Sequence, residues 1–98
     1  MQAPEIHYIS LKDYQGLIGD KIRIKATDNF QVTEVKVRIT NAKGTLLEKG
    51  EAIRYPRKQA MWVYTVTVAN PDLQGTVVNV IAEDRPGNVV EMEEEIGG

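Results

Sequence analysis

The chain of 98 residues carries 12 lysines and arginines against 14 aspartates and glutamates, which gives a formal net charge of −2. A balance this close to neutrality gives no reason to expect nucleic acid or an anionic membrane surface as a partner. Cysteine is absent, which excludes a disulfide framework and any zinc site built on sulfur. The length predicts one domain over residues 1–98 with a core over 5–96, and no stretch has the apolar pattern of a signal peptide or a membrane-inserted helix.

Short runs of alternating apolar and polar residues recur along the first half of the chain, with turn residues between them. Such runs predict strands with one buried face and one solvated face. In the second run, Ile22 and Ile24 point to one face while Arg23 and Lys25 point to the other. The strands expected in this half are 5–9, 21–27, 34–40, 45–48 and a weaker one at 51–54. The segment that follows contains Pro56, which cannot donate to a strand ladder, and we expect it to form a loop.

The second half holds the longest apolar runs, and the strands expected there are 61–69, 76–83 and 88–96. Trp62, Tyr64, Val66 and Val68 occupy alternate positions of the first of these runs, so they share one face. That face is otherwise apolar, which favours Trp62 as an anchor of the core. The alternative places Trp62 on an exposed face beside Tyr64 and Tyr55, where it would be a platform for stacking a sugar ring. The evenly spaced strands together predict an antiparallel sandwich or barrel.

The turn before the last strand is expected to begin at Arg85. Pro86 would then take the second position and Gly87 the third, where a type II turn requires a positive φ. Because Pro86 has no N–H, the carboxylate of Asp84 can accept hydrogen bonds only from the amides of Gly87 or Asn88. We therefore interpret Asp84 as a structural residue.

The residues that carry catalysis in enzymes are scarce in this chain. The one histidine, His7, has no serine or cysteine motif beside it, and we interpret it as a surface side chain on an edge strand. Gly16 and Gly19 are not followed by the residues of a phosphate-binding loop. Alternation spreads the glutamates of 91–95 along and across a strand, where they discourage pairing between sheet edges. We expect no enzymatic activity, no cofactor and no metal.

Calcium is the one metal that the sequence leaves as an alternative. Asp28 and Asp84 would lie at the same end of a sandwich, with Asn29 and Asn88 nearby. Calcium takes about six to eight oxygen ligands, usually including several carboxylates, and neither loop contains an Asp-x-Asp series. We therefore favour Asp28 as a turn former.

Five segments occur in a characteristic order, at 24–28, 32–37, 62–64, 73–75 and 82–88. Their order and spacing resemble those of bacterial immunoglobulin-like domains, the disulfide-free repeats of adhesins, surface-anchored proteins and secreted enzymes. The chain departs from that family at 29–31, where such domains commonly carry a glycine, and in having no second copy of the repeat.

The resemblance implies an all-β immunoglobulin-like antiparallel β-sandwich of about seven strands. It also implies a non-catalytic structural, spacer or interaction module of a bacterial surface or secreted protein, including proteins of adhesion. Neighbouring domains of a parent chain would be its partners, and we expect a monomer. An extracellular location follows from the resemblance alone.

In such a sandwich the loops 28–32, 54–60 and 84–88 lie at the same pole. That pole would gather two aromatic residues and three cations, namely Phe30, Tyr55, Arg57, Lys58 and Arg85. This composition is typical of recognition surfaces, so the alternative function is a ligand-binding module for a glycan or protein. We favour the other interpretation, in which the aromatics cap the ends of the core and the cations are solvated.

Overall fold

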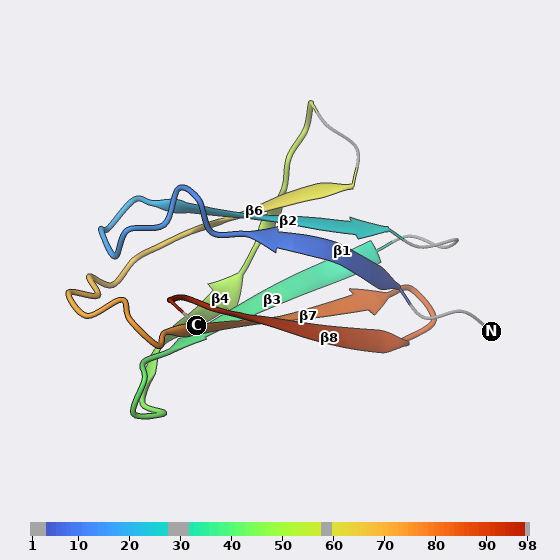
Figure 1. Ribbon diagram of the computed structural model, residues 1–98. Helices are drawn as coiled ribbons and strands as arrows, with labels where there is room; N and C mark the ends of the chain where they lie inside the picture. The colour runs from blue at the N-terminus through green and yellow to red at the C-terminus, as the bar shows by residue number, and fades with distance from the viewer. Residues whose placement is uncertain (1–3, 28–31, 58–59, 98) are drawn as a thin grey trace.

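The computed structural model describes residues 4–27, 32–57 and 60–97, which form two four-stranded antiparallel sheets packed face to face (Figure 1). The first sheet has the strand order β1-β2-β6-β5 and the second the order β4-β3-β7-β8. The strands are β1 (Glu5–Ser10), β2 (Lys21–Thr27), β3 (Val32–Thr40), β4 (Leu46–Glu51), β5 (Ile53–Arg54), β6 (Met61–Thr65), β7 (Val77–Asp84) and β8 (Val89–Glu95). The predicted immunoglobulin-like antiparallel sandwich is confirmed, and the described residues form eight strands where about seven were expected.

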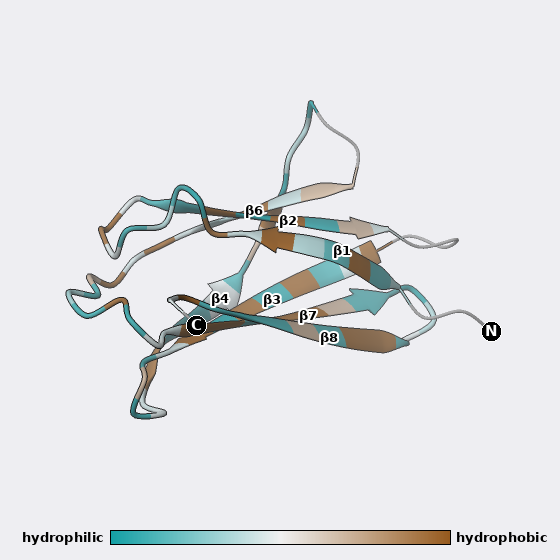
Figure 2. Cartoon of the chain, in the orientation of Figure 1, coloured by the Kyte–Doolittle hydropathy of each residue, from teal (hydrophilic) through white to brown (hydrophobic). Residues whose placement is uncertain are grey.

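The core lies between the two sheets, and the alternation of the sequence accounts for it. Hydrophobic and hydrophilic positions alternate along the strands (Figure 2), and the residues of the hydrophobic set are the buried ones. Among the described residues, the hydrophobic ones with no exposed surface are Ile22, Ile24, Val35, Val37, Ile39, Val78, Val80 and Ala82. Burying a side chain of the larger of these types stabilises the fold by about 1.5–3 kcal/mol. Trp62 and Tyr64 are buried in the same core, so Trp62 anchors the sandwich and is not a surface platform.

The strand predicted at 61–69 ends at Thr65, and Val68 is exposed, contrary to the expectation that it faces the core. Backbone pairing continues as far as Val66, whose N–H donates to the carbonyl of Asp20 over 2.9 Å. The next two amides, of Thr67 and Val68, donate instead to the side chain of Glu48. The strand therefore stops because a carboxylate replaces the neighbouring strand as acceptor.

The chain changes sheets between β4 and β5. The expected strands at 45–48 and 51–54 are in fact Leu46–Glu51 in the second sheet and Ile53–Arg54 in the first. Ala52 lies at the crossing, where it is buried and its N–H donates to the carbonyl of Val35 over 2.8 Å. The residues before Ala52 alternate with respect to one sheet and those after it with respect to the other. Residues 51–54 therefore show only a weak strand pattern in the sequence.

The turn at 84–88 begins one residue earlier than predicted. The N–H of Gly87 donates to the carbonyl of Asp84 over 3.0 Å, and Gly87 has a φ of 98°. A three-residue loop that ends in a left-handed glycine is a common hairpin connection. The predicted role of Asp84 is confirmed, because its Oδ1 accepts from the amides of Gly87 at 3.0 Å and Asn88 at 2.8 Å.

Candidate functional site

The structure brings the flanks of the three predicted recognition loops to one end of the sandwich, which we call the loop pole. Val32 pairs with Asp84, and the N–H of Ala26 donates to the carbonyl of Ala60 over 2.9 Å. Phe30 and Lys58 lie outside the described residues. Arg57 and Arg85 are exposed.

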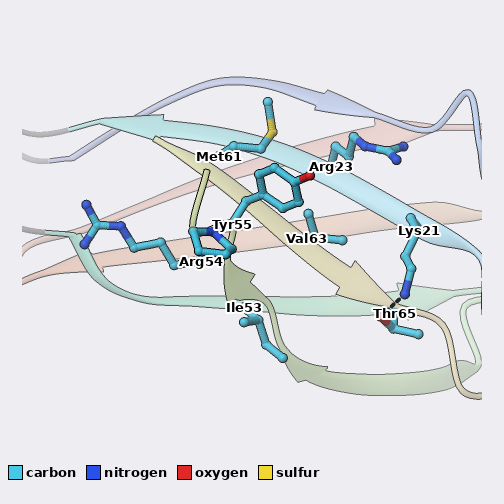
Figure 3. A pocket seen from close by; sticks show the side chains of 9 residues that line it. Lys21, Arg23, Ile53, Arg54, Tyr55, Met61, Val63 and Thr65 are labelled. Atoms are coloured by element: carbon cyan, nitrogen blue, oxygen red, sulfur yellow. Dashed lines mark hydrogen bonds between the residues drawn. The ribbon is translucent and has the colours of Figure 1, made fainter. Parts of the chain in front are cut away.

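Tyr55 does not cap the core, contrary to the interpretation that we favoured from the sequence. It is 45% exposed and lies outside the core cluster. Its ring lies over the outer face of the first sheet, near Met61 and Val63, with the hydroxyl directed toward Arg23 (Figure 3). Two of the residues predicted to share a recognition surface are therefore in different places. Tyr55 lies on a sheet face, and Arg85 lies in the β7–β8 turn.

Tyr55 forms one wall of a groove of about 510 Å³ on that outer face. The floor is formed by outward-facing side chains of β2 and β6, and the wall by β5 and the first residues of the β5–β6 loop. The described residues that line it are Lys21, Arg23, Ile53, Arg54, Tyr55, Pro56, Met61, Val63 and Thr65 (Figure 3). We call this feature the β6 groove.

The charged side chains of the β6 groove are all cationic among the described lining residues. Lys21 donates from Nζ to Oγ1 of Thr65 over 2.7 Å, and Arg23 forms an ion pair with Asp13. Arg54 is exposed and forms no ion pair with any residue that the structure describes. The groove therefore presents positive charge beside apolar surface.

A second polar feature lies inside the opposite end of the sandwich, which we call the network pole. Glu48 of β4 is 8% exposed. Its Oε1 accepts from the hydroxyl of Tyr64 at 2.5 Å and from the amide and hydroxyl of Thr67 at 3.0 and 2.9 Å. Its Oε2 accepts from the amide of Val68 at 3.1 Å. One carboxylate of the second sheet thus satisfies four donors on and after β6 of the first.

These contacts change the acidity of both partners. Burial alone would raise the pKa of Glu48, but the hydrogen bonds from Tyr64, Thr67 and Val68 outweigh it and hold the pKa below its ordinary value. Burial, together with the hydrogen bond to Glu48, raises the pKa of the Tyr64 hydroxyl. Glu48 is therefore a buried anion that is compensated by hydrogen bonds, and it forms no ion pair within the part of the chain that the structure describes.

Asn70 links the neighbouring loops of the network pole. Its Nδ2 donates to the hydroxyl of Tyr14 at 3.3 Å and to Oγ1 of Thr76 at 3.0 Å, and all three side chains are buried. Burial raises the pKa of Tyr14, against the effect of its hydrogen bond with Asn70. The three polar groups satisfy one another, which is the usual condition for burying them.

Sequence reasoning missed the network, because an irregularity in the β3–β4 pairing interrupts the alternation there: Leu46 is exposed while Glu48 is buried. The one signal was Tyr64, since a core tyrosine needs a partner for its hydroxyl. Gly50 then leaves room for that ring, because a Cβ there would lie 3.0 Å from Cε1 of Tyr64.

His7 lies at an irregularity of β1. Ile6 pairs with Ala26 and Tyr8 with Lys25, so His7 is the additional residue of a bulge. Its ring is exposed, with Nε2 2.5 Å from Oγ1 of Thr27 and Nδ1 3.4 Å from Glu5.

Within residues 4–27, 32–57 and 60–97, no three or more histidine or acidic side chains are grouped so that they could hold a metal ion. Asp28 and Asn29 of the calcium alternative lie outside those ranges. In the same ranges, no helix has the length and apolar character needed to cross a membrane.

No protein-family model matches the sequence, and no curated protein matches it significantly. The fold is similar to that in the crystal structure of CopC from Methylosinus trichosporium OB3b, with a TM-score of 0.64. The alignment covers 92% of this chain and 87% of that chain at 13% sequence identity. Identity this low shows a shared β-sandwich fold and does not carry over a ligand or an activity.

Proposed function

We propose that this chain is a non-catalytic immunoglobulin-like module of the bacterial type, which acts as a spacer between neighbouring domains of a surface or secreted protein. The observation that carries the proposal is the placement of the first and last strands. β1 starts at the loop pole, where Glu5 pairs with Thr27, and β8 ends at the network pole, where Glu95 pairs with Val77 (Figure 1). The chain thus enters and leaves at opposite ends of a body 40 Å long and 27 by 20 Å across.

This arrangement suits a module that transmits tension. β1 and β8 both run from the loop pole to the network pole and are in contact with each other. A force applied through the two ends therefore acts along the strands and loads the pairing of β1 with β2 and of β8 with β7 in shear. Glu48 adds a polar connection between the sheets, because its carboxylate in the second sheet binds Tyr64 in the first.

Force spectroscopy tests the proposal. The protein would be pulled through its two termini, and in a matched experiment through its N-terminus and a linkage at Gly87, so that both attachments are at the loop pole. We expect clearly higher unfolding forces in the first geometry, because shear loads many hydrogen bonds together while the second geometry opens them one after another. Equal forces in the two geometries, or substrate turnover by the purified protein, would contradict the proposal.

A further inference from the structure

The outer face of the first sheet carries a row of cations along β2. Lys21, Arg23 and Lys25 alternate with buried residues of that strand, so all three point away from the core. Lys21 and Arg23 lie beside the β6 groove (Figure 3). Arg23 forms an ion pair with Asp13, whereas Lys25 is exposed and forms none with any residue that the structure describes. We call these three residues the basic ladder.

The outer face of the second sheet carries the opposite charge along β8. Glu91, Glu93 and Glu95 are exposed and alternate with partly buried residues that pack against the core. Glu91 accepts a hydrogen bond from Asn79, while Glu93 and Glu95 form no ion pair within the described part of the chain. We call these three glutamates the acidic ladder. Both ladders use every second residue of a strand, so their charges share a spacing of about 7 Å.

Apolar surface lies beside both ladders. On β6, the strand next to β2, Val63 is half-buried and pairs with Ile53, which is 74% exposed. On β7, the strand next to β8, the outward Val77 and Ile81 are half-buried. Each face thus has a charged strand beside a more apolar one. One rotation about the sheet normal lays β8 on β2 and β7 on β6, so opposite charges and apolar surfaces meet in the same contact.

The charges disfavour contacts between two like faces. Two first-sheet faces would bring two basic ladders together. On the second sheet, the cations of β3 and β4 are mixed with Glu34 and Glu51, and Lys36 already pairs with Glu34 over 3.4 Å. An acidic ladder placed over those strands would meet glutamates as well as cations. Only the contact between unlike faces matches one ladder with the other.

We propose that copies of this chain associate by stacking the outer face of the first sheet on the outer face of the second sheet of the next copy, with the basic ladder of one against the acidic ladder of the other. The two faces lie on opposite sides of the molecule, so each copy can bind two others in an open row. This state differs from the monomer expected from the sequence, and it does not depend on the spacer function.

The size of the contact sets its strength. From the rise and spacing of strands, a four-stranded face of this kind covers roughly 450 Å². Standard interfaces bury about 800 Å² on each partner. We therefore expect weak association, with a Kd for each contact on the order of 100 μM.

Sedimentation velocity of the purified protein tests the proposal at concentrations from about 0.01 to about 1 mM, which bracket the expected Kd. The average sedimentation coefficient should rise with concentration and pass the value of a dimer, because the row is open. Raising the salt concentration from about 0.05 M to about 1 M should weaken the association at least about fivefold, because the Debye length falls to roughly 3 Å.

Charge reversals assign the contact to the ladders. Lys25→Glu and Glu93→Lys should each weaken the association about fivefold. The double variant should recover the native affinity to within about twofold, because its reversed ladders are again complementary. The matched controls are Lys43→Glu and Asp72→Lys, which make the same changes of net charge at exposed loop positions outside both ladders. Both controls should associate like the native protein, and dispersed amide spectra would show that each variant is folded.

Several results would overturn the proposal. A sedimentation coefficient that does not change up to about 1 mM, or an association that is insensitive to salt, would exclude a contact made by the ladders. An association that stops at a dimer would show a contact between like faces. Failure of the double variant to recover, or an equal loss in the controls, would separate the association from Lys25 and Glu93. Hexalysine that binds more tightly than a second copy would make the acidic ladder a site for basic peptides.

Discussion

Replacing Glu48 with glutamine tests whether the buried carboxylate holds the two sheets together. The carboxylate accepts four hydrogen bonds, three at Oε1 and one at Oε2. An amide has one oxygen, so in its better orientation glutamine still satisfies Tyr64 and Thr67 but turns an NH₂ group toward the amide of Val68. The loss of that one acceptor costs about 1–3 kcal/mol, and the three remaining bonds lose their charge assistance. The neutral amide is cheaper to bury, which offsets part of this loss. We expect Glu48→Gln to lower the free energy of unfolding by about 2–3 kcal/mol.

The dependence on pH gives a second, independent readout. The pKa of Glu48 is lower in the folded protein than its ordinary value of 4.5. Stabilisation by the ionised carboxylate is therefore fully present above pH 4.5 and is lost as the pH falls through the lower, folded value. The difference in stability between the native protein and Glu48→Gln should be constant at neutral pH and should shrink below pH 4.5.

Urea unfolding at a series of pH values measures both effects, provided that the m-value is unchanged. Glu51→Gln is the matched control, since it removes an exposed glutamate from the same strand. Tyr64→Phe removes one partner of Glu48, and the double variant should show a coupling energy of about 1 kcal/mol. The reasoning would be refuted if Glu48→Gln stayed within about 0.5 kcal/mol of the native protein, the usual range for surface changes, or if the difference did not vary with pH.

Two further substitutions test local geometry by the same unfolding assay. Asp84→Ala leaves the amides of Gly87 and Asn88 without their acceptor, and we expect a loss of about 1–2 kcal/mol; a change below about 0.5 kcal/mol would show that water replaces the carboxylate at no cost. Ala60 has a φ of 67°, a left-handed conformation that strains any residue with a Cβ. Glycine removes this strain but gives the unfolded chain more entropy. We expect the first effect to be the larger, so that Ala60→Gly stabilises the fold by about 0.5 kcal/mol. Ala69 is the matched control, because it is exposed and has no positive φ. Ala69→Gly should destabilise the fold by about 0.5 kcal/mol. Equal effects of the two substitutions would show that the backbone of Ala60 is not strained.

Local patterns in the sequence were sufficient for the sandwich and for part of its detail. The period-two alternation places Ile24 and Val37 in the core because burial on one face is a property of each strand alone. The role of Asp84 was predictable for a similar reason, since its partners are three and four residues away in the chain.

Features that depend on distant partners could not be predicted in the same way. Nothing near Thr65 in the sequence ends its strand; the amides that follow are taken by Glu48, which lies 19 and 20 residues earlier. The outward alternation of Met61 predicts exposure, and its burial results from the path of the β5–β6 loop. In both cases a residue on another element decides the outcome.

The crossing at Ala52 connects the two polar features of the molecule. Before it, β4 carries Glu48 into the core beneath β6. After it, β5 pairs with the edge of β6, and Tyr55 lies over the outer face of that strand. On the core side of β6, the hydroxyl of Tyr64 donates to Glu48. On the outer side, Tyr55 lies next to Met61. Because only Lys49, Gly50, Glu51 and Ala52 separate Glu48 from β5, a change in the position of β4 would be transmitted to the wall of the groove. The buried network and the β6 groove thus contact opposite sides of β6 and are linked along the chain by one short segment.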